Sequence, residues 1–408
     1  MNVLSVNKFF WKKGGSEAVF FSEIEMLESA GHRVAPFSMH SVNNIQSDYS
    51  KFFINEIDYS SPRLITRLGA AAKIIYSFEA KKKMERLLLD FIPDIAHFHI
   101  FQHQISPSVF SPLRAKKVPL VLTLHDLKPI CPNYKMYVGG KVCEECHGGR
   151  FYNCFKNKCT KGSTLMSLVN TVEMYFHYAM GYYQSVDRYI AVSHFYRNKM
   201  IEYGFAPEKI DYLPNYVDCS QFNAGAEDGS YVLYFGRLSE EKGVSILLDA
   251  AATLKRVQFK IVGTGPLELV LRQKASSEAL TNVQFLGFKS GEELKSILQG
   301  ATAVVVPSEW YENCPMTILE SYAAGRPVIG ANIGGIPELI ESEVDGLVFH
   351  TGDAESLAGA IDTLWSNRGR ARAMGSAGRE KIEQCYNAQV HYDGLMTIYN
   401  SVLSSHSV

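Results

Sequence analysis

The feature that most constrains the fold is a regular alternation of short apolar strand patterns with helical patterns along the 408 residues. Strands separated by amphipathic helices form parallel sheets, because each helix returns the chain to the same edge of the sheet. The alternation therefore predicts an α/β fold. The expected strands lie at 2–7, 32–39, 95–100, 119–125, 188–193, 210–214, 231–238, 259–265, 283–288, 303–308 and 327–331.

The alternation restarts after a Gly-, Asp- and Ser-rich stretch at about residues 216–228. A chain of this length is also too long for one ordinary core. We therefore expect two Rossmann-like domains that face each other across a cleft. The predicted parts are an N-terminal domain (1–217), a C-terminal domain (218–385) and a final helix (386–408) that packs back on the N-terminal domain.

Charge and hydropathy narrow the classes of partner. A net charge of −1 gives no general basic field, so nucleic acid is not an expected partner. The N-terminus lacks a signal-peptide pattern, and no apolar run reaches the roughly 18 residues of a membrane-spanning helix. We expect a cytoplasmic protein. Basic residues dominate a helical pattern at 63–91, which fits either an ordinary surface helix or a peripheral membrane contact.

Glycine loops follow three of the expected strands. Gly15 lies after the first strand, in "KKGGSE", and Gly265 lies in "IVGTGP". In "YFGRLSEEKG", Gly236 ends a strand and is followed by Arg237 and Lys242. Two cations at the carboxyl end of a parallel strand suit a diphosphate. The alternative is that both cations pair at the surface with the neighbouring acids Glu240 and Glu241.

Two glutamates, Glu312 and Glu320, lie eight residues apart around Pro315. Proline suits the first position of a helix, so the amides of Met316 and Thr317 would be available to an anion. Glu312 would then face the sugar end of a nucleotide-linked donor. Glu320 would accept hydrogen bonds from ribose hydroxyls. The alternative is that both acids are simply solvated.

Cysteines are concentrated in one segment, which suggests a metal more than a disulfide framework in a chain without an export signal. Cys143 and Cys146 form a C-x2-C pair of the kind that binds zinc. We expect a structural zinc loop, with an iron–sulfur cluster or free thiols as alternatives. The candidates for the other ligands are Cys131, His147, Cys154 and Cys159.

The order of these motifs resembles the retaining family-4 glycosyltransferases of the GT-B fold. The resemblance is carried by the N-terminal Gly-Gly loop, "GRLSEEKG", "VGTGP", and the E-x7-E pair before "AAGRPVIG" and "GGIPELI". It implies transfer of a hexose from a nucleotide diphosphate sugar to an acceptor hydroxyl, with the anomeric configuration kept. It also implies a role in bacterial surface polysaccharide or glycolipid synthesis, with a glycan or lipid-linked acceptor.

The resemblance also implies roles for individual residues. His125 would lie close to the transferred sugar, Arg237 and Lys242 would hold the diphosphate, and Glu312 would contact the sugar. The expected donor-binding residues are Gly15, Gly236, Gly265, Asn313, Met316, Thr317 and Glu320. The expected zinc ligands are Cys131, Cys143, Cys146 and Cys159, with Cys154 as the alternative.

The chain also departs from the family pattern. Tyr311 and Asn313 stand where the family motif often has glycine, so the donor sugar stays open. No aspartate pair has the D-x-D spacing, so no catalytic metal is expected.

Two other functions use the same architecture. One is a sugar-nucleotide epimerase or hydrolase, in which water or an acid pair replaces the acceptor. The other is a non-catalytic zinc-bearing scaffold, although a scaffold has no use for Arg237, Lys242, Glu312 and Glu320 together.

Overall fold

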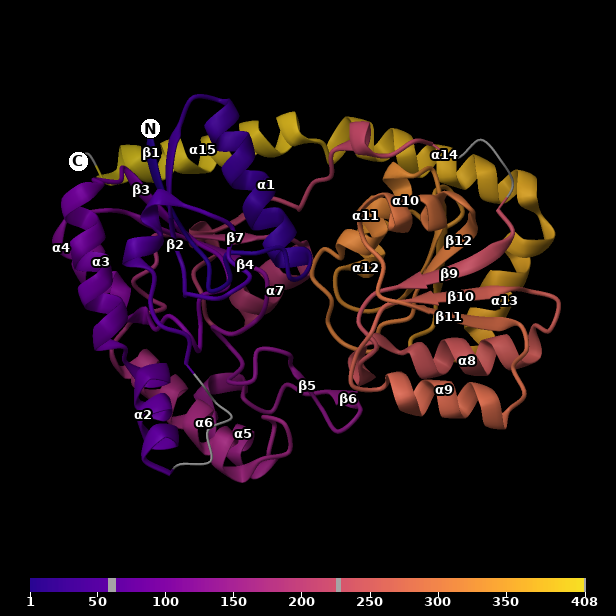
Figure 1. The fold of residues 1–408 in the computed structure, drawn as a ribbon, viewed down its shortest axis with the longest axis horizontal. Helices are drawn as coiled ribbons and strands as arrows, with labels where there is room; N and C mark the ends of the chain where they lie inside the picture. The colour runs from indigo at the N-terminus through magenta and orange to yellow at the C-terminus, as the bar shows by residue number, and fades with distance from the viewer. Residues whose placement is uncertain (58–63, 225–228, 407–408) are drawn as a thin grey trace. The chain divides into compact units, whose positions relative to one another are not determined.

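The computed structural model of the chain describes residues 1–57, 64–224 and 229–406. The chain divides into two compact units, and each contains a six-stranded parallel sheet with helices around it (Figure 1). This confirms the predicted α/β class. The first unit comprises Met1–Met136, Glu144–Leu213 and Tyr392–Val408, and the second comprises Tyr137–Cys143 and Pro214–His391.

The sheet of the first unit has the strand order β2-β1-β3-β4-β7-β8, with every neighbouring pair parallel. Its central strands are buried on both faces, as expected where helices cover a parallel sheet. Pro36 is tolerated in β2 because β2 is an edge strand. The strands are β1 (Asn2–Val6), β2 (Arg33–Phe37), β3 (Ile95–Phe98), β4 (Leu120–Leu124), β7 (Arg188–Ala191) and β8 (Ile210–Tyr212).

Helices connect these strands, and serine side chains cap three of them. Ser77, Ser163 and Ser193 accept hydrogen bonds from backbone amides at the starts of α3, α6 and α7. The helices are α1 (Gly15–Ser29), α2 (Leu64–Ile75), α3 (Phe78–Asp90), α4 (Phe110–Ala115), α5 (Tyr152–Lys156), α6 (Thr164–Ala179) and α7 (His194–Glu202). Short 3-10 helices lie at Asp48–Phe52, Pro107–Val109, His147–Gly149 and Pro207–Lys209.

The core of the first unit includes the last helix of the chain. Val3, Ile95 and Val121 from the sheet pack in one buried cluster with Leu395 and Tyr399 of α15 (Ala388–His406). The C-terminal segment thus covers one face of the sheet that the N-terminus begins.

The second unit repeats the design with the strand order β11-β10-β9-β12-β13-β14, again parallel throughout. Its strands are β9 (Tyr231–Phe235), β10 (Phe259–Val262), β11 (Val283–Gly287), β12 (Ala301–Val306), β13 (Val328–Ala331) and β14 (Gly346–Phe349). Its helices are α8 (Val244–Thr253), α9 (Glu268–Ser277), α10 (Gly291–Gln299), α11 (Met316–Ala323), α12 (Ile336–Leu339), α13 (Ala354–Ser366) and α14 (Arg368–Cys385), with 3-10 turns at Cys219–Gln221 and Glu240–Lys242.

The cysteine-rich segment interrupts the first unit between β4 and α6. It contains an antiparallel hairpin of β5 (Tyr137–Val138) and β6 (Lys141–Val142), followed by α5. The hairpin residues group with the second unit and the rest of the segment with the first.

The basic segment at 63–91 differs from its prediction. It is not one helix but two, since Ser77 caps a new helix, α3, after α2 ends at Ile75. Leu87 is fully buried in the first unit, as an apolar residue of an ordinary surface helix would be. Arg63 and the side chains of residues 64–68 lie outside the described part of the structure. Over the residues that are described, we find no helix both long and apolar enough to cross a membrane.

Candidate active site

In the second unit, the glycine loops after β9 and β10 touch through their backbones. The Leu238 amide donates to the Thr264 carbonyl at 3.0 Å, and the Leu267 amide donates to the Leu238 carbonyl at 3.0 Å. A Cβ atom on Gly265 would lie 2.3 Å from the Leu238 oxygen, and one on Gly263 would lie 1.9 Å from the Gly236 oxygen. Only glycine allows this approach.

The loop after β12 is tied to the β9 loop in the same way. Gly243 has φ +66°, and a Cβ atom there would lie 1.8 Å from the Pro307 carbonyl oxygen. The Glu309 amide also donates to the Glu241 carbonyl at 2.9 Å. These contacts hold Lys242 beside the β12 loop.

Lys242 and Glu312, predicted from separate motifs, form an ion pair. Lys242 Nζ lies 2.6 Å from Glu312 Oε1, and Ser308 Oγ donates to the same oxygen at 2.7 Å. The Glu312 side chain is buried, whereas Lys242 is partly exposed. Lys242 therefore pairs with Glu312. The surface alternative, in which it pairs with Glu240 or Glu241, is wrong for Lys242.

Gly236 and Arg237 are both exposed at the end of β9. The Tyr234 hydroxyl donates to the Arg237 carbonyl at 2.8 Å. Burial raises the pKa of Tyr234, so its phenol stays protonated as a donor. The Arg237 backbone is thus fixed while its guanidinium faces solvent.

The second glutamate lies inside α11. This helix begins at Met316, so Pro315 is its N-cap residue and not its first helical residue, a correction of one position. Met316, Thr317 and Glu320 are partly exposed. Burial raises the pKa of Glu320 to about 7.

Asn313 turns its side chain toward the local backbone. Its Oδ1 accepts a hydrogen bond from the Cys314 amide at 2.6 Å. This places Asn313 in the turn that leads from Glu312 into α11.

In the first unit, His125 follows β4 and contacts a second histidine. Its Nε2 lies 2.9 Å from His99 Nδ1, and the two rings are stacked with centroids 5.2 Å apart. His125 is partly exposed, while His99 is buried.

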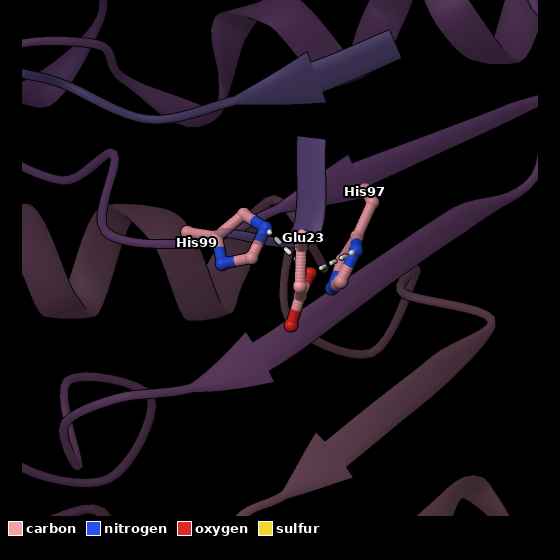
Figure 2. A group of neighbouring side chains, drawn as sticks. All are labelled: Glu23, His97 and His99. Carbon is pink, nitrogen blue, oxygen red and sulfur yellow. Dashed lines mark ion pairs between the residues drawn. The ribbon is translucent and has the colours of Figure 1, made fainter. Parts of the chain in front are cut away.

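Glu23, His97 and His99 form a buried group that was not predicted from the sequence (Figure 2). Glu23 Oε2 lies 3.5 Å from His97 Nδ1 and 3.4 Å from His99 Nε2. Tyr399 Oη lies 2.8 Å from His97 Nδ1, and Thr123 Oγ1 lies 2.7 Å from His97 Nε2.

One carboxylate and two imidazoles are ligands that could hold a cation. The same histidine rings also take part in hydrogen bonds with Thr123, His125 and Tyr399. The "HFH" run at 97–99 puts both histidines on one face of the strand. Nothing near Glu23 in the sequence indicates that it joins them.

Further ionisable groups lie near the ends of β1 and β4. Burial lowers the pKa of Lys8 and raises those of Glu17 and Asp126. Gly15 is exposed and is the first residue of α1, whose N-cap is Gly14 in extended backbone. This end of the sheet thus places polar side chains beside a helix start.

The predicted zinc ligands all lie in the cysteine-rich segment. In the described ranges, three-residue groups with ligand atoms within 4.8 Å of one another include Glu23, His97 and His99 but none of the cysteines. Cys146 and Cys154 pack in a buried cluster with Cys159 at its border, whereas Cys143 groups with the second unit. Burial raises the pKa of the Cys131 thiol to about 12, whereas a hydrogen bond with Cys159 lowers the pKa of Cys154. The zinc site remains a prediction.

Family comparisons follow this division of the chain. Residues 220–381 match the family model described as "Glycosyl transferases group 1", and residues 13–221 match "Glycosyltransferase Family 4". The chain is a member of glycosyltransferase family 4.

Relatives of this family 4 member share part of their length with it. The amylovoran biosynthesis glycosyltransferase AmsK of Erwinia amylovora is 30% identical over 223 residues, 51% of this chain and 55% of that protein. The O-antigen chain mannosyltransferase C of Escherichia coli is 30% identical over 214 residues, 52% of this chain and 57% of that protein. The chain thus spans a little over half the length of these relatives.

Solved structures agree on the fold of the family 4 chain. Sucrose-phosphate synthase from Thermosynechococcus elongatus superposes with a TM-score of 0.74 at 18% identity, covering 99% of both chains. Anabaena HepE, in complex with UDP and glucose, superposes with a TM-score of 0.69 at 17% identity, covering 98% of this chain and all of the other. Together with the family match, this supports the predicted GT-B fold.

Proposed function

We propose that this protein transfers a hexose from a nucleotide diphosphate sugar to an acceptor hydroxyl with retention of configuration and without a catalytic metal. The observation that carries the proposal is the Lys242–Glu312 pair, held among glycine loops at the carboxyl ends of β9 and β12. Ligands of open α/β sheets bind at such strand ends.

Lys242 supplies the charge that the leaving diphosphate requires. An ammonium fixed in position before the reaction stabilises developing negative charge without reorganisation. The buried carboxylate of Glu312 holds the Lys242 ammonium in place, and the Ser308 hydroxyl holds that carboxylate. In a retaining transfer the protein mainly positions donor and acceptor, so no separate nucleophile is required of it.

The other predicted residues keep their proposed roles. Arg237 contacts the diphosphate from solvent, while Gly236, Gly265, Asn313, Met316 and Thr317 line the donor site. Glu320 accepts from the ribose hydroxyls. His125 lies close to the transferred sugar, and Gly15 serves the acceptor.

The relatives suggest the biological setting. One acts in amylovoran biosynthesis and another is an O-antigen chain mannosyltransferase. We propose a bacterial surface polysaccharide or glycolipid as the product and a glycan or lipid-linked molecule as the acceptor. A cytoplasmic location, a structural zinc ion in the cysteine segment, and a peripheral membrane contact through residues 63–91 are further proposals.

The test is a thermal-shift screen of nucleoside diphosphates and nucleotide sugars, with and without Mg²⁺. We expect one nucleotide series to stabilise the protein independently of Mg²⁺, because a ligand that binds only the folded state raises its stability. Lys242→Ala should abolish the shift and lower donor kcat/KM by about 100-fold. Lys274→Ala is the matched control, since Lys274 pairs with Asp249 and lies outside these loops.

The outcomes separate the candidate functions. No shift with any nucleotide would contradict the donor site and favour the scaffold. Release of free sugar at full rate without any acceptor would favour the hydrolase. The anomeric configuration of the product, read by NMR, tests retention.

A further inference from the structure

The polar and apolar faces of helix α6 are exchanged relative to those of a usual surface helix, because its buried face is polar. The buried residues are Ser167, Asn170, Thr171, Glu173, Met174 and His177, of which only Met174 is apolar. A surface helix of a globular protein normally turns its apolar stripe inward. Two things therefore need a physical explanation: why polar residues of α6 are buried, and why apolar residues are exposed.

The inward polar groups are used in specific contacts. Glu173 Oε2 accepts from Lys128 Nζ at 2.7 Å, and Asn170 Nδ2 donates to Thr160 Oγ1 at 2.9 Å. His177 Nε2 lies 2.9 Å from the Ile75 carbonyl. These contacts fix the rotation of α6 about its axis. The apolar residues on the opposite side of the helix therefore face solvent.

The outward face of α6 is apolar and continues onto α5, which packs against α6 (Figure 1). Tyr175 joins the two helices, since its hydroxyl accepts from the Tyr152 amide at 3.2 Å. The α5–α6 face is defined here as Tyr152, Phe155, Leu165, Leu168, Val172 and Tyr175, with exposed fractions between 41% and 53%. An apolar patch of this kind marks an interaction surface.

The exposed charges within residues 150–180 have one sign, although the exposed acid Glu145 lies beside α5, where its Oε2 accepts from Asn157 Nδ2 at 2.9 Å. Between residues 150 and 180 the one acidic residue is Glu173, which is buried against Lys128. The basic residues of the same segment are all exposed: Arg150, Lys156, Lys158 and Lys161. The exposed surface of the segment thus combines apolar side chains with positive charge only.

We propose that the α5–α6 face docks on the surface of a bilayer containing anionic phospholipids. An apolar helix face accompanied by Lys and Arg is the pattern of interfacial membrane binding, with the apolar groups entering the acyl boundary and the cations meeting lipid phosphates. A second copy of the chain fits less well, because joining two such faces would bring two sets of basic side chains together.

This site differs from the membrane contact expected at 63–91. On α3, Met84, Leu87 and Leu88 are buried in the first unit, so most of its apolar side chains are turned inward, although Phe78 and Leu89 are exposed. The proposal does not depend on the donor site. Vesicle binding can be measured without a nucleotide or an acceptor.

The experiment is co-sedimentation of the full chain with phosphatidylcholine vesicles, with and without phosphatidylglycerol, at several salt concentrations. We expect binding only to the anionic vesicles, weakening as salt rises. The variant L168S/V172S should weaken binding at least tenfold. The variant K156Q/K158Q/K161Q should weaken it about 100-fold, at roughly fivefold for each lysine.

Matched variants control for folding and for general charge. L269S/V270S removes exposed apolar side chains from α9, and K116Q/K117Q removes exposed lysines beside α4; both should bind vesicles like the unmodified chain. Thermal midpoints of all variants show whether a loss of binding comes from unfolding, because Leu168 and Val172 are only 42% and 45% exposed. K82Q/R86Q tests the separate contact proposed at residues 63–91, and the binding that this variant retains is assigned to the α5–α6 face.

Two results would overturn the proposal. One is no binding of the unmodified chain to anionic vesicles at low salt. The other is equal binding by L168S/V172S and the unmodified chain. If light scattering instead showed a dimer that L168S/V172S converts to a monomer, the face would belong to a second copy and the membrane assignment would be wrong.

Discussion

The carboxyl ends of the two sheets have the same topology but are built from different chemistry. In the second unit, glycine loops pack backbone against backbone and present a partly exposed Lys242. In the first unit, the strand ends are backed by buried side chains, including Glu23, His99 and the Lys128–Glu173 pair. The end in the second unit is shaped by glycines, which lack side chains, and the end in the first unit by buried ionisable side chains.

The difference has an energetic consequence. Glycine loops fix a binding site through the main chain, so a single added methyl group disturbs them. Buried ionisable groups fix a site through pairing, so removing one partner leaves a desolvated charge. The two units should therefore respond to different kinds of mutation.

The largest effect is expected in the first unit. Both members of the Lys128–Glu173 pair are about 1% exposed, so Lys128→Met should lower the free energy of unfolding by about 3–5 kcal/mol. Equilibrium urea unfolding measures this loss. Lys51→Met, which breaks an exposed pair with Asp90, is the control and should cost less than about 1 kcal/mol. Equal losses in both variants would contradict the comparison.

The Lys128–Glu173 pair should also make the stability of the protein fall at low pH. Burial opposes ionisation of Glu173, but the Lys128 ammonium beside it outweighs burial and lowers its pKa to about 2, from an ordinary 4.5. The pair's contribution should therefore be complete above about pH 4.5 and be lost as the pH falls toward 2.

A smaller effect is expected from the backbone of the second unit. Gly243→Ala should lower the free energy of unfolding by about 3 kcal/mol, because left-handed strain adds to a clash with the Pro307 carbonyl. Gly352→Ala is a matched control: it has φ +79° with no atom within 4 Å of the added Cβ atom. It should cost only the strain, about 1–2 kcal/mol. Equal costs would mean that the loop contact with Pro307 does not hold.

The smallest effect concerns Glu320 and depends on pH. Between about pH 4.5 and 7 the folded state keeps a proton that the unfolded state has released, so stability falls as the pH rises through this window. Glu320→Gln should therefore be more stable than the unmodified chain by about 1–2 kcal/mol at about pH 8, allowing for partial exposure.

That gain from Glu320→Gln should disappear below about pH 4.5. Thermal melts of both proteins across the pH range measure it. A gain of the same size at every pH would show that the carboxyl group of Glu320 does not titrate in this way.

The sequence predicted the second unit well because its signals are local. Gly236, Gly265 and Lys242 lie within a few residues of strand ends, and each was found from its own short motif. What no motif could give is the Lys242–Glu312 bond, which joins residues 70 positions apart. Strand β14 was also missed, since "GLVF" is short and weakly patterned.

The first unit was harder to predict because its polar groups are dispersed. Glu23 lies in the middle of a helix, and Glu173 belongs to a helix whose faces are exchanged. A periodic pattern shows that a helix has two faces but does not say which one meets the core. Tertiary contacts, here the bond from Glu173 to Lys128, decide that.

The last helix places a constraint on the order of biosynthesis. Leu395, Ile398, Tyr399 and Val402 complete a core that begins with Val3 at the other end of the chain. A ribosome that has made the first 390 residues has therefore produced every strand of both sheets, yet the first unit still lacks one wall of its core. The first unit completes its core only once the segment that begins at Tyr392 has been made, whereas the second unit has all of its own residues by His391. The first unit therefore exposes apolar core surface for longer during synthesis.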